Sequence, residues 1–175
     1  MKTAKAVVLA MDLRDPEPWP NLGLSSRHLA PVANKPVLFH HLEGLSAAGI
    51  GETAIVCDRR SSAGIREAVG DGSAWDLDVR YVEESPHESF LSSSVLAGFI
   101  GSAPVLVQHG DVLLNENLSS LREQFADRGL DALVMHAGQR STDGYLIGAG
   151  VYLDLRRHPA PLGDALARLL SLIHI

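Results

Sequence analysis

Short apolar runs rich in β-branched residues constrain the fold of this chain more than any other feature. Their length and composition are those of β-strands. Six such runs occur: "KAVVLA" (5–10), "TAIVCD" (53–58), "LDVRYVE" (77–83), "PVLVQHG" (104–110), "LDALVMHA" (130–137) and "YLIGAGVYL" (145–153). In the first four, Val, Ile and Leu are nearly continuous, which predicts strands buried on both faces, as in a parallel sheet covered by helices.

Segments with helical spacing of apolar residues separate these runs. The predicted helices are 36–48, 62–69, 88–100 and 116–128. The first has leucines at positions 38, 42 and 45 on one stripe, with Pro36 in its first turn and Gly49 as its stop signal. Alternating strands and helices predict an α/β fold with a mostly parallel central sheet flanked by helices, in a single domain over residues 1–175.

Composition excludes several classes of protein. The 175 residues are 46% hydrophobic and carry a net charge of −6, and the 15 Lys and Arg are scattered, so no nucleic-acid partner is expected. The single cysteine, Cys57, leaves no disulfide or CxxC site and favours a reducing compartment. The longest apolar run before Asp12 has six residues (6–11), too few for a signal peptide or a membrane span, so we expect a cytoplasmic protein without a membrane partner.

Four stretches resemble the sugar-1-phosphate nucleotidyltransferases, the family that includes glucose-1-phosphate thymidylyltransferase. "SRHLAPVANKP" (26–36) is similar to the family's K-x-L-x-P-V motif and following K-P, and "GDGSAWDLDVRYVEE" (70–84) to its G-D-G-S turn and strand. "VLVQHGDVLL" (105–114) resembles its strand ending in Gly-Asp, and "GYLIGAGVYL" (144–153) the strand that lines its sugar pocket. The likeness is nearly gapless from Lys5 to about Leu114.

The resemblance implies a three-layer, Rossmann-like (GT-A-type) domain that binds a nucleoside triphosphate and a sugar-1-phosphate. The sugar-1-phosphate would attack the α-phosphorus and release pyrophosphate, with Mg²⁺ as cofactor. It implies Asp111 as the metal ligand and Arg27 as the phosphate-contacting cation, although arginine presents a planar fork where the family has lysine. The implied substrate-binding residues are Leu9, Ala10, Met11, Arg14, Glu84, Gly110, Tyr145 and Gly148.

The sequence departs from the family where the triphosphate would be held. The family's GGxGTR loop falls on "MDLRDP" (11–16), which has no glycine to bring backbone N–H groups close to phosphate, and Pro16 has no N–H. "ESPHESFLSSS" (84–94) replaces a glycine-containing turn in the base-reading segment. The family's second metal-binding aspartate lies downstream of the part present here. An alternative function is therefore a non-catalytic relative that binds a sugar nucleotide or acts as a structural or regulatory partner.

Other candidate residues have simpler interpretations. "DLD" (76–78) matches a DxD metal motif, but it falls in a turn before a predicted strand. His40 and His41 are adjacent on a predicted helix, which favours two surface histidines over a metal pair. His28 and His109 are expected near the pocket, where a structural role is the commoner one.

Two expectations concern arrangement in space. Because loops after adjacent parallel strands converge at the carboxyl end of a sheet, residues 11–27 should lie beside Asp111. The apolar segment 162–175 should dock onto the domain's own sheet or onto a second chain, which would make a homo-oligomer.

Overall fold

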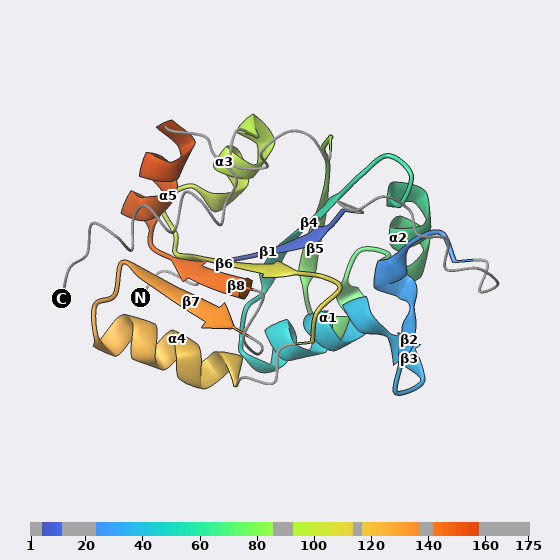
Figure 1. Ribbon diagram of the computed structural model, residues 1–175, viewed down its shortest axis with the longest axis horizontal. Helices are drawn as coiled ribbons and strands as arrows, with labels where there is room; N and C mark the ends of the chain where they lie inside the picture. The colour runs from blue at the N-terminus through green and yellow to red at the C-terminus, as the bar shows by residue number, and fades with distance from the viewer. Residues whose placement is uncertain (1–4, 12–23, 86–92, 114–116, 137–141, 158–175) are drawn as a thin grey trace.

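A six-stranded sheet organises the computed structural model, which describes residues 5–11, 24–85, 93–113, 117–136 and 142–157 (Figure 1). The strand order is β5-β4-β1-β6-β8-β7. The strands are β1 (Lys5–Ala10), β4 (Glu52–Cys57), β5 (Asp78–Glu83), β6 (Val105–His109), β7 (Ala132–His136) and β8 (Thr142–Ile147). β1, β4, β5 and β6 are mutually parallel, whereas β8 is antiparallel to both β6 and β7. The predicted mostly parallel sheet is confirmed.

Helices cover both faces of this sheet and complete the predicted three layers. They are α1 (Val37–Ala47), α2 (Ser62–Val69), α3 (Ser94–Ile100), α4 (Leu118–Asp127) and α5 (Ala149–Arg157), with 3₁₀ turns η1 (Arg27–Leu29) and η2 (Ser73–Trp75). A small hairpin joins β2 (Pro31–Val32) to β3 (Lys35–Pro36). α3 and α5 lie on one side of the sheet, and α1 and α4 on the other (Figure 1).

Alternation along the central strand divides the core in two. Val7 and Leu9 of β1 point to the face covered by α3 and α5, and Ala6, Val8 and Ala10 point to the face covered by α1, α2 and α4. Every one of these side chains is buried. A strand buried on both faces requires apolar residues at successive positions, which explains the continuous apolar runs.

The predicted helix boundaries are mostly confirmed, with shifts explained by capping. Gly49 has φ +68° and its N–H donates to the Ser46 carbonyl, so it ends α1 as expected. Pro36 precedes the first turn, with an extended ψ of 139°. α3 is described from Ser94, with the Ser93 hydroxyl accepting from Leu96 N, and the Asn117 side chain caps α4 in the same way. Residues 88–92 of the predicted third helix lie outside the described residues.

The predicted strand over 145–153 is wrong in its second half. β8 ends at Ile147, and residues from Ala149 onwards form α5. β7 pairs with β8 only as far as Ile147, so no further strand is supported there. Tyr152 and Leu155, three residues apart, are both buried against the sheet, which is the spacing of a helix face.

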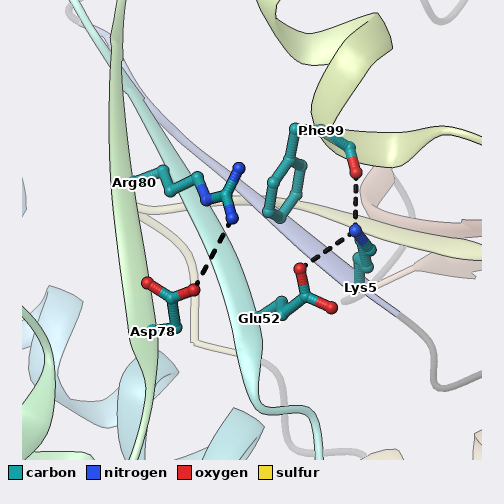
Figure 2. Close-up of polar contacts among 5 residues, drawn as sticks. All are labelled: Lys5, Glu52, Asp78, Arg80 and Phe99. Carbon is teal, nitrogen blue, oxygen red and sulfur yellow. Dashed lines mark hydrogen bonds and ion pairs between the residues drawn. The ribbon is translucent and has the colours of Figure 1, made fainter.

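Charged residues gather at the amino edge of the parallel strands (Figure 2). The Lys5 ammonium contacts Glu52 at 3.0 Å and donates to the Phe99 carbonyl at 2.7 Å. Arg80 lies 3.7 Å from Asp78, and its guanidinium is 5.6 Å from the centre of the Phe99 ring. These contacts tie β1, β4 and β5 to α3 at the edge opposite the carboxyl ends of the same strands.

No helix in the described part of the chain is long and apolar enough to cross a membrane.

Replacing Leu42 by Ala should lower the free energy of unfolding by about 2–5 kcal/mol, because its fully buried side chain packs α1 against the sheet. Urea denaturation followed by circular dichroism measures the change. Leu153→Ala is the matched control, since that leucine is 45% exposed and should change stability little. Equal losses in the two variants would contradict this account of the core.

Candidate functional site

The parallel strands β1, β4, β5 and β6 end at one edge of the sheet, where the site is predicted. Met11, Asp58, Glu84 and Gly110 directly follow them. The Glu84 N–H donates to the Cys57 carbonyl at 3.0 Å, and the Gly110 N–H donates to the Leu9 carbonyl at 2.9 Å. The ladder therefore continues one residue past the strands and holds their ends together.

Arg27 and Asp111 meet at this edge. The Arg27 guanidinium lies 3.7 Å from the Asp111 carboxylate, and 19% and 33% of the two side chains are exposed. Arg27 opens the turn η1, which is capped by the Ser26 hydroxyl, and Asp111 lies just after β6. The expectation that these two residues share one end of the sheet is confirmed. A guanidinium and an accessible carboxylate side by side can contact an anion and a cation together.

The two pocket histidines predicted from the sequence lie near this pair. His28 is 1% exposed, and its Nδ1 lies 2.9 Å from the Ser26 hydroxyl. His109 is half-buried and stands opposite Leu9 in the ladder. His28 therefore belongs to the structural support of the η1 turn.

The other described substrate residues implied by the resemblance lie in two places, at this edge and along or just after β8. Leu9, Ala10 and Met11 are buried, so their side chains belong to the core. Tyr145 is also buried, on the face covered by α3 and α5.

Gly148 comes after β8 at the opposite edge of the sheet. β8 runs antiparallel to β6, so that Ile147 pairs with Val105 at the start of β6. The structure does not bring Gly148 to the Arg27–Asp111 pair.

The turn after β4 was not predicted from the sequence. Asp58 is 4% exposed, and its carboxylate accepts from Arg60 N at 2.8 Å and Ser61 N at 3.0 Å. The buried Ser61 hydroxyl lies 3.2 Å from the Asp58 carbonyl of its own turn and 3.4 Å from the Ala10 carbonyl. The feature of the sequence that could have indicated this turn is an aspartate directly after an apolar run. This turn ties the end of β4 to the end of β1 next to the site.

The expectation of two surface histidines is wrong for His41. Its ring is 5% exposed because α1 turns it toward β6, where it lies near Gln108, which is 1% exposed. The Nε2 atom of His41 and both amide atoms of Gln108 have no hydrogen-bond partner among the described residues. Both residues line a cavity of about 500 Å³ between α1 and α4. His40 is half-buried, and its Nε2 lies 2.8 Å from the Val32 carbonyl.

Burial lowers the pKa of His41 to about 4, and the nearby Gln108 amide offsets that effect only in part. The ring is therefore neutral at neutral pH. Burial also raises the pKa of the Cys57 thiol, which keeps the thiol protonated and disfavours a role as nucleophile.

The donors for a metal ion are few in the part of the chain that the structure describes. No group of three or more His, Cys, Asp or Glu residues there could hold an ion. Asp78 of the DxD-like sequence lies at the amino edge, 3.7 Å from Arg80, far along the strands from Asp111. Mg²⁺ commonly takes one or two carboxylates and completes its shell with phosphate oxygens and water, so Asp111 fits as a partial site.

Several predicted features fall outside the described residues. They are Arg14 and the rest of the loop 12–23, the segment 86–92, and the C-terminal segment 162–175 with its expected docking.

A family model described as nucleotidyl transferase matches residues 24–146. Glucose-1-phosphate thymidylyltransferase of Streptomyces antibioticus is 33% identical over 104 residues, 59% of this chain and 29% of that protein. The enzyme of the same name from Streptomyces griseus is 39% identical over 88 residues, 50% of this chain and 24% of that protein. The chain thus spans less than a third of the length of these relatives.

Solved structures show the same fold. A candidate glucose-1-phosphate thymidylyltransferase from Bacillus anthracis, crystallised with sucrose, superposes with a TM-score of 0.72 at 16% identity, covering 94% of this chain and 78% of that one. UDP-glucose pyrophosphorylase with bound UDP-glucose superposes with a TM-score of 0.69 at 12% identity, covering 99% and 89%. At such identities the likeness concerns the fold alone.

Acid should destabilise the protein through His41. The pKa of this ring is about 4 in the folded chain and 6.5 for an ordinary histidine, so the unfolded chain gains a proton first as the pH falls. The free energy of unfolding is unaffected by protonation of His41 above about pH 6.5. It falls by at most about 3 kcal/mol as the pH is lowered toward 4. Urea unfolding measured above pH 6.5 and again at pH 4 should show a smaller loss of unfolding free energy on acidification for His41→Leu than for the wild type. His40→Leu is the control, and an unchanged acid loss in His41→Leu would refute the assignment.

Proposed function

The chain belongs to the nucleotidyl transferase family, and on that premise we propose that it binds a nucleoside triphosphate at the carboxyl edge of its sheet. It would transfer the nucleotidyl group to a sugar-1-phosphate and release pyrophosphate. The observation that carries the proposal is the pairing of Arg27 with Asp111 at 3.7 Å, on elements that the family match covers. The names of the relatives make glucose-1-phosphate and a thymidine triphosphate the first substrates to test.

The two side chains suit the two kinds of charge on such a substrate. Arg27 would donate to phosphate oxygens, and its positive charge would stabilise the charge that develops as pyrophosphate leaves. Asp111 would hold Mg²⁺ through its exposed carboxylate oxygens. The ion, when bound, would polarise the phosphate and neutralise part of its charge. The reaction needs no covalent nucleophile on the protein, since the oxygen of the sugar-1-phosphate attacks directly.

Positioning would come from the tied strand ends. In-line transfer depends on holding the reacting groups in a narrow geometry, which contributes much of the rate in such reactions. The Ser61 hydroxyl holds the turn after β4 to the Ala10 carbonyl, and Gly110 N–H holds the end of β6 to Leu9. These bonds fix the floor on which the phosphates would lie.

The sequence of the loop after β1 favours slow turnover. Asp12 stands where the family has a glycine, and Asp15 and Glu17 add further negative charge in and just after the same stretch. One carboxylate about 4 Å from a phosphate costs roughly 4 kcal/mol near a protein surface. This charge supports a second candidate function, a non-catalytic relative that binds a sugar nucleotide or assists an active partner. The buried, protonated Cys57 is compatible with a cytoplasmic protein, which we propose as its location.

Pyrophosphate release with Mg²⁺, a thymidine triphosphate and glucose-1-phosphate should be slow, and far below that of a relative that keeps the glycine loop. A coupled phosphate assay measures it, with a relative whose sequence has the GGxGTR loop as reference. Turnover equal to the reference would refute the effect ascribed to the loop charges. Binding of a sugar nucleotide without turnover would favour the second function.

Arg27→Ala and Asp111→Asn should each weaken triphosphate binding in the presence of Mg²⁺ by about tenfold or more. The first removes a hydrogen bond to a charged group, which contributes about 1.5–3 kcal/mol, and the second removes the carboxylate that would hold the ion. Isothermal titration calorimetry measures the affinity. Arg80→Ala and Asp78→Asn make the same chemical changes in an ion pair at the amino edge and serve as controls. Equal effects at both edges would place the triphosphate elsewhere.

A further inference from the structure

We propose that Gly64 and Gly110 are positioning residues that fix Arg27 opposite Asp111. Neither has a side chain, and this lets the turn from Ser25 to His28 lie directly against α2 and the end of β6. The inference rests on the proposed function in one respect, the role of Arg27 as the phosphate contact. The geometric part of it is independent of any ligand.

The first contact is between α2 and the residue before the turn's cap. A Cβ atom added at Gly64 would overlap the Ser25 hydroxyl and come within 2.7 Å of Ser25 Cβ. Gly64 has ordinary helical backbone angles, and glycine inside a helix is less favourable than alanine. Backbone conformation therefore does not require a glycine here. The close approach of Ser25 is what requires a glycine at position 64.

The second contact is between the turn and the residue before Asp111. A Cβ atom added at Gly110 would lie 3.1 Å from Cδ2 of His28 and 3.2 Å from the Leu9 carbonyl. The His28 ring is buried and held by the Ser26 hydroxyl, so it cannot swing away without loss of that contact. The ring thus packs directly against the backbone that leads to Asp111.

Together the two contacts bracket Arg27. Ser25 lies directly against α2 and His28 against the end of β6, while the Ala30 carbonyl accepts from Val37 N at the start of α1. The Arg27 backbone lies between these anchors, so a shift of Ser25 displaces the guanidinium relative to Asp111. A guanidinium displaced from its phosphate loses a charge-assisted hydrogen bond.

Gly64→Ala tests the inference. It should weaken triphosphate binding with Mg²⁺ about tenfold in calorimetry, the loss expected for one hydrogen bond to a charged group. Gly98→Ala is the matched control, because Gly98 is an exposed glycine of α3 with open space around it. It should leave binding unchanged. Adding Ser25→Gly to Gly64→Ala removes the overlap and should restore most of the affinity, whereas a general loss of stability would not be rescued in this way.

Crystal structures of Gly64→Ala and the double variant give the readout that needs no ligand. The distance from Arg27 to Asp111 should exceed the present 3.7 Å in the single variant and return in the double variant. An unmoved Arg27 in Gly64→Ala overturns the inference, as does a binding loss that Ser25→Gly fails to restore. If the wild type binds no triphosphate, the proposed function fails and the crystal structures alone decide. Should Gly64→Ala not fold, Ser25→Leu crowds the same contact by enlarging the side chain at position 25 instead of at position 64.

Discussion

The parallel pairing of β1 with β4 and β6 is the constraint on which the rest of the structure depends. Val7 stands opposite Ala54 on one side and Val107 on the other, so the three strands end in step. That register brings the residues that follow the three strands to one edge of the sheet. Both faces of the sheet are buried under helices. A change of register by one residue would turn each side chain of β1 to the opposite face of the sheet.

Polar groups near this edge serve mainly to hold backbone segments together. Asp58 satisfies two backbone N–H groups of its own turn, and Ser61 reaches the carbonyl of Ala10. His28 supports the turn that presents Arg27. The Arg27–Asp111 pair at this edge is partly exposed. A precise arrangement of few charges on a rigid edge is what phosphate chemistry requires of a protein.

The chain combines a well-formed nucleotidyl transferase sheet with an unusual sequence at the place of the phosphate loop. The sheet depends on apolar periodicity and tolerates many different sequences in the loops after its strands. The loop depends on backbone N–H groups that approach phosphate closely, which acidic residues and Pro16 oppose. The residues that build the sheet are therefore different from those on which phosphate binding in this family depends.

The sequence by itself determined the four parallel strands, most helices and the meeting of Arg27 with Asp111, because apolar periodicity is local and parallel strands align their ends. It did not distinguish the end of β8 from the start of α5. Only the tertiary structure decided the burial of His41 beside Gln108, the reversal of β8 that carries Gly148 away from the site, and the contact of Gly64 with Ser25. Each of these depends on segments distant along the chain that meet only when the sheet and its helices pack. No local pattern encodes such a meeting.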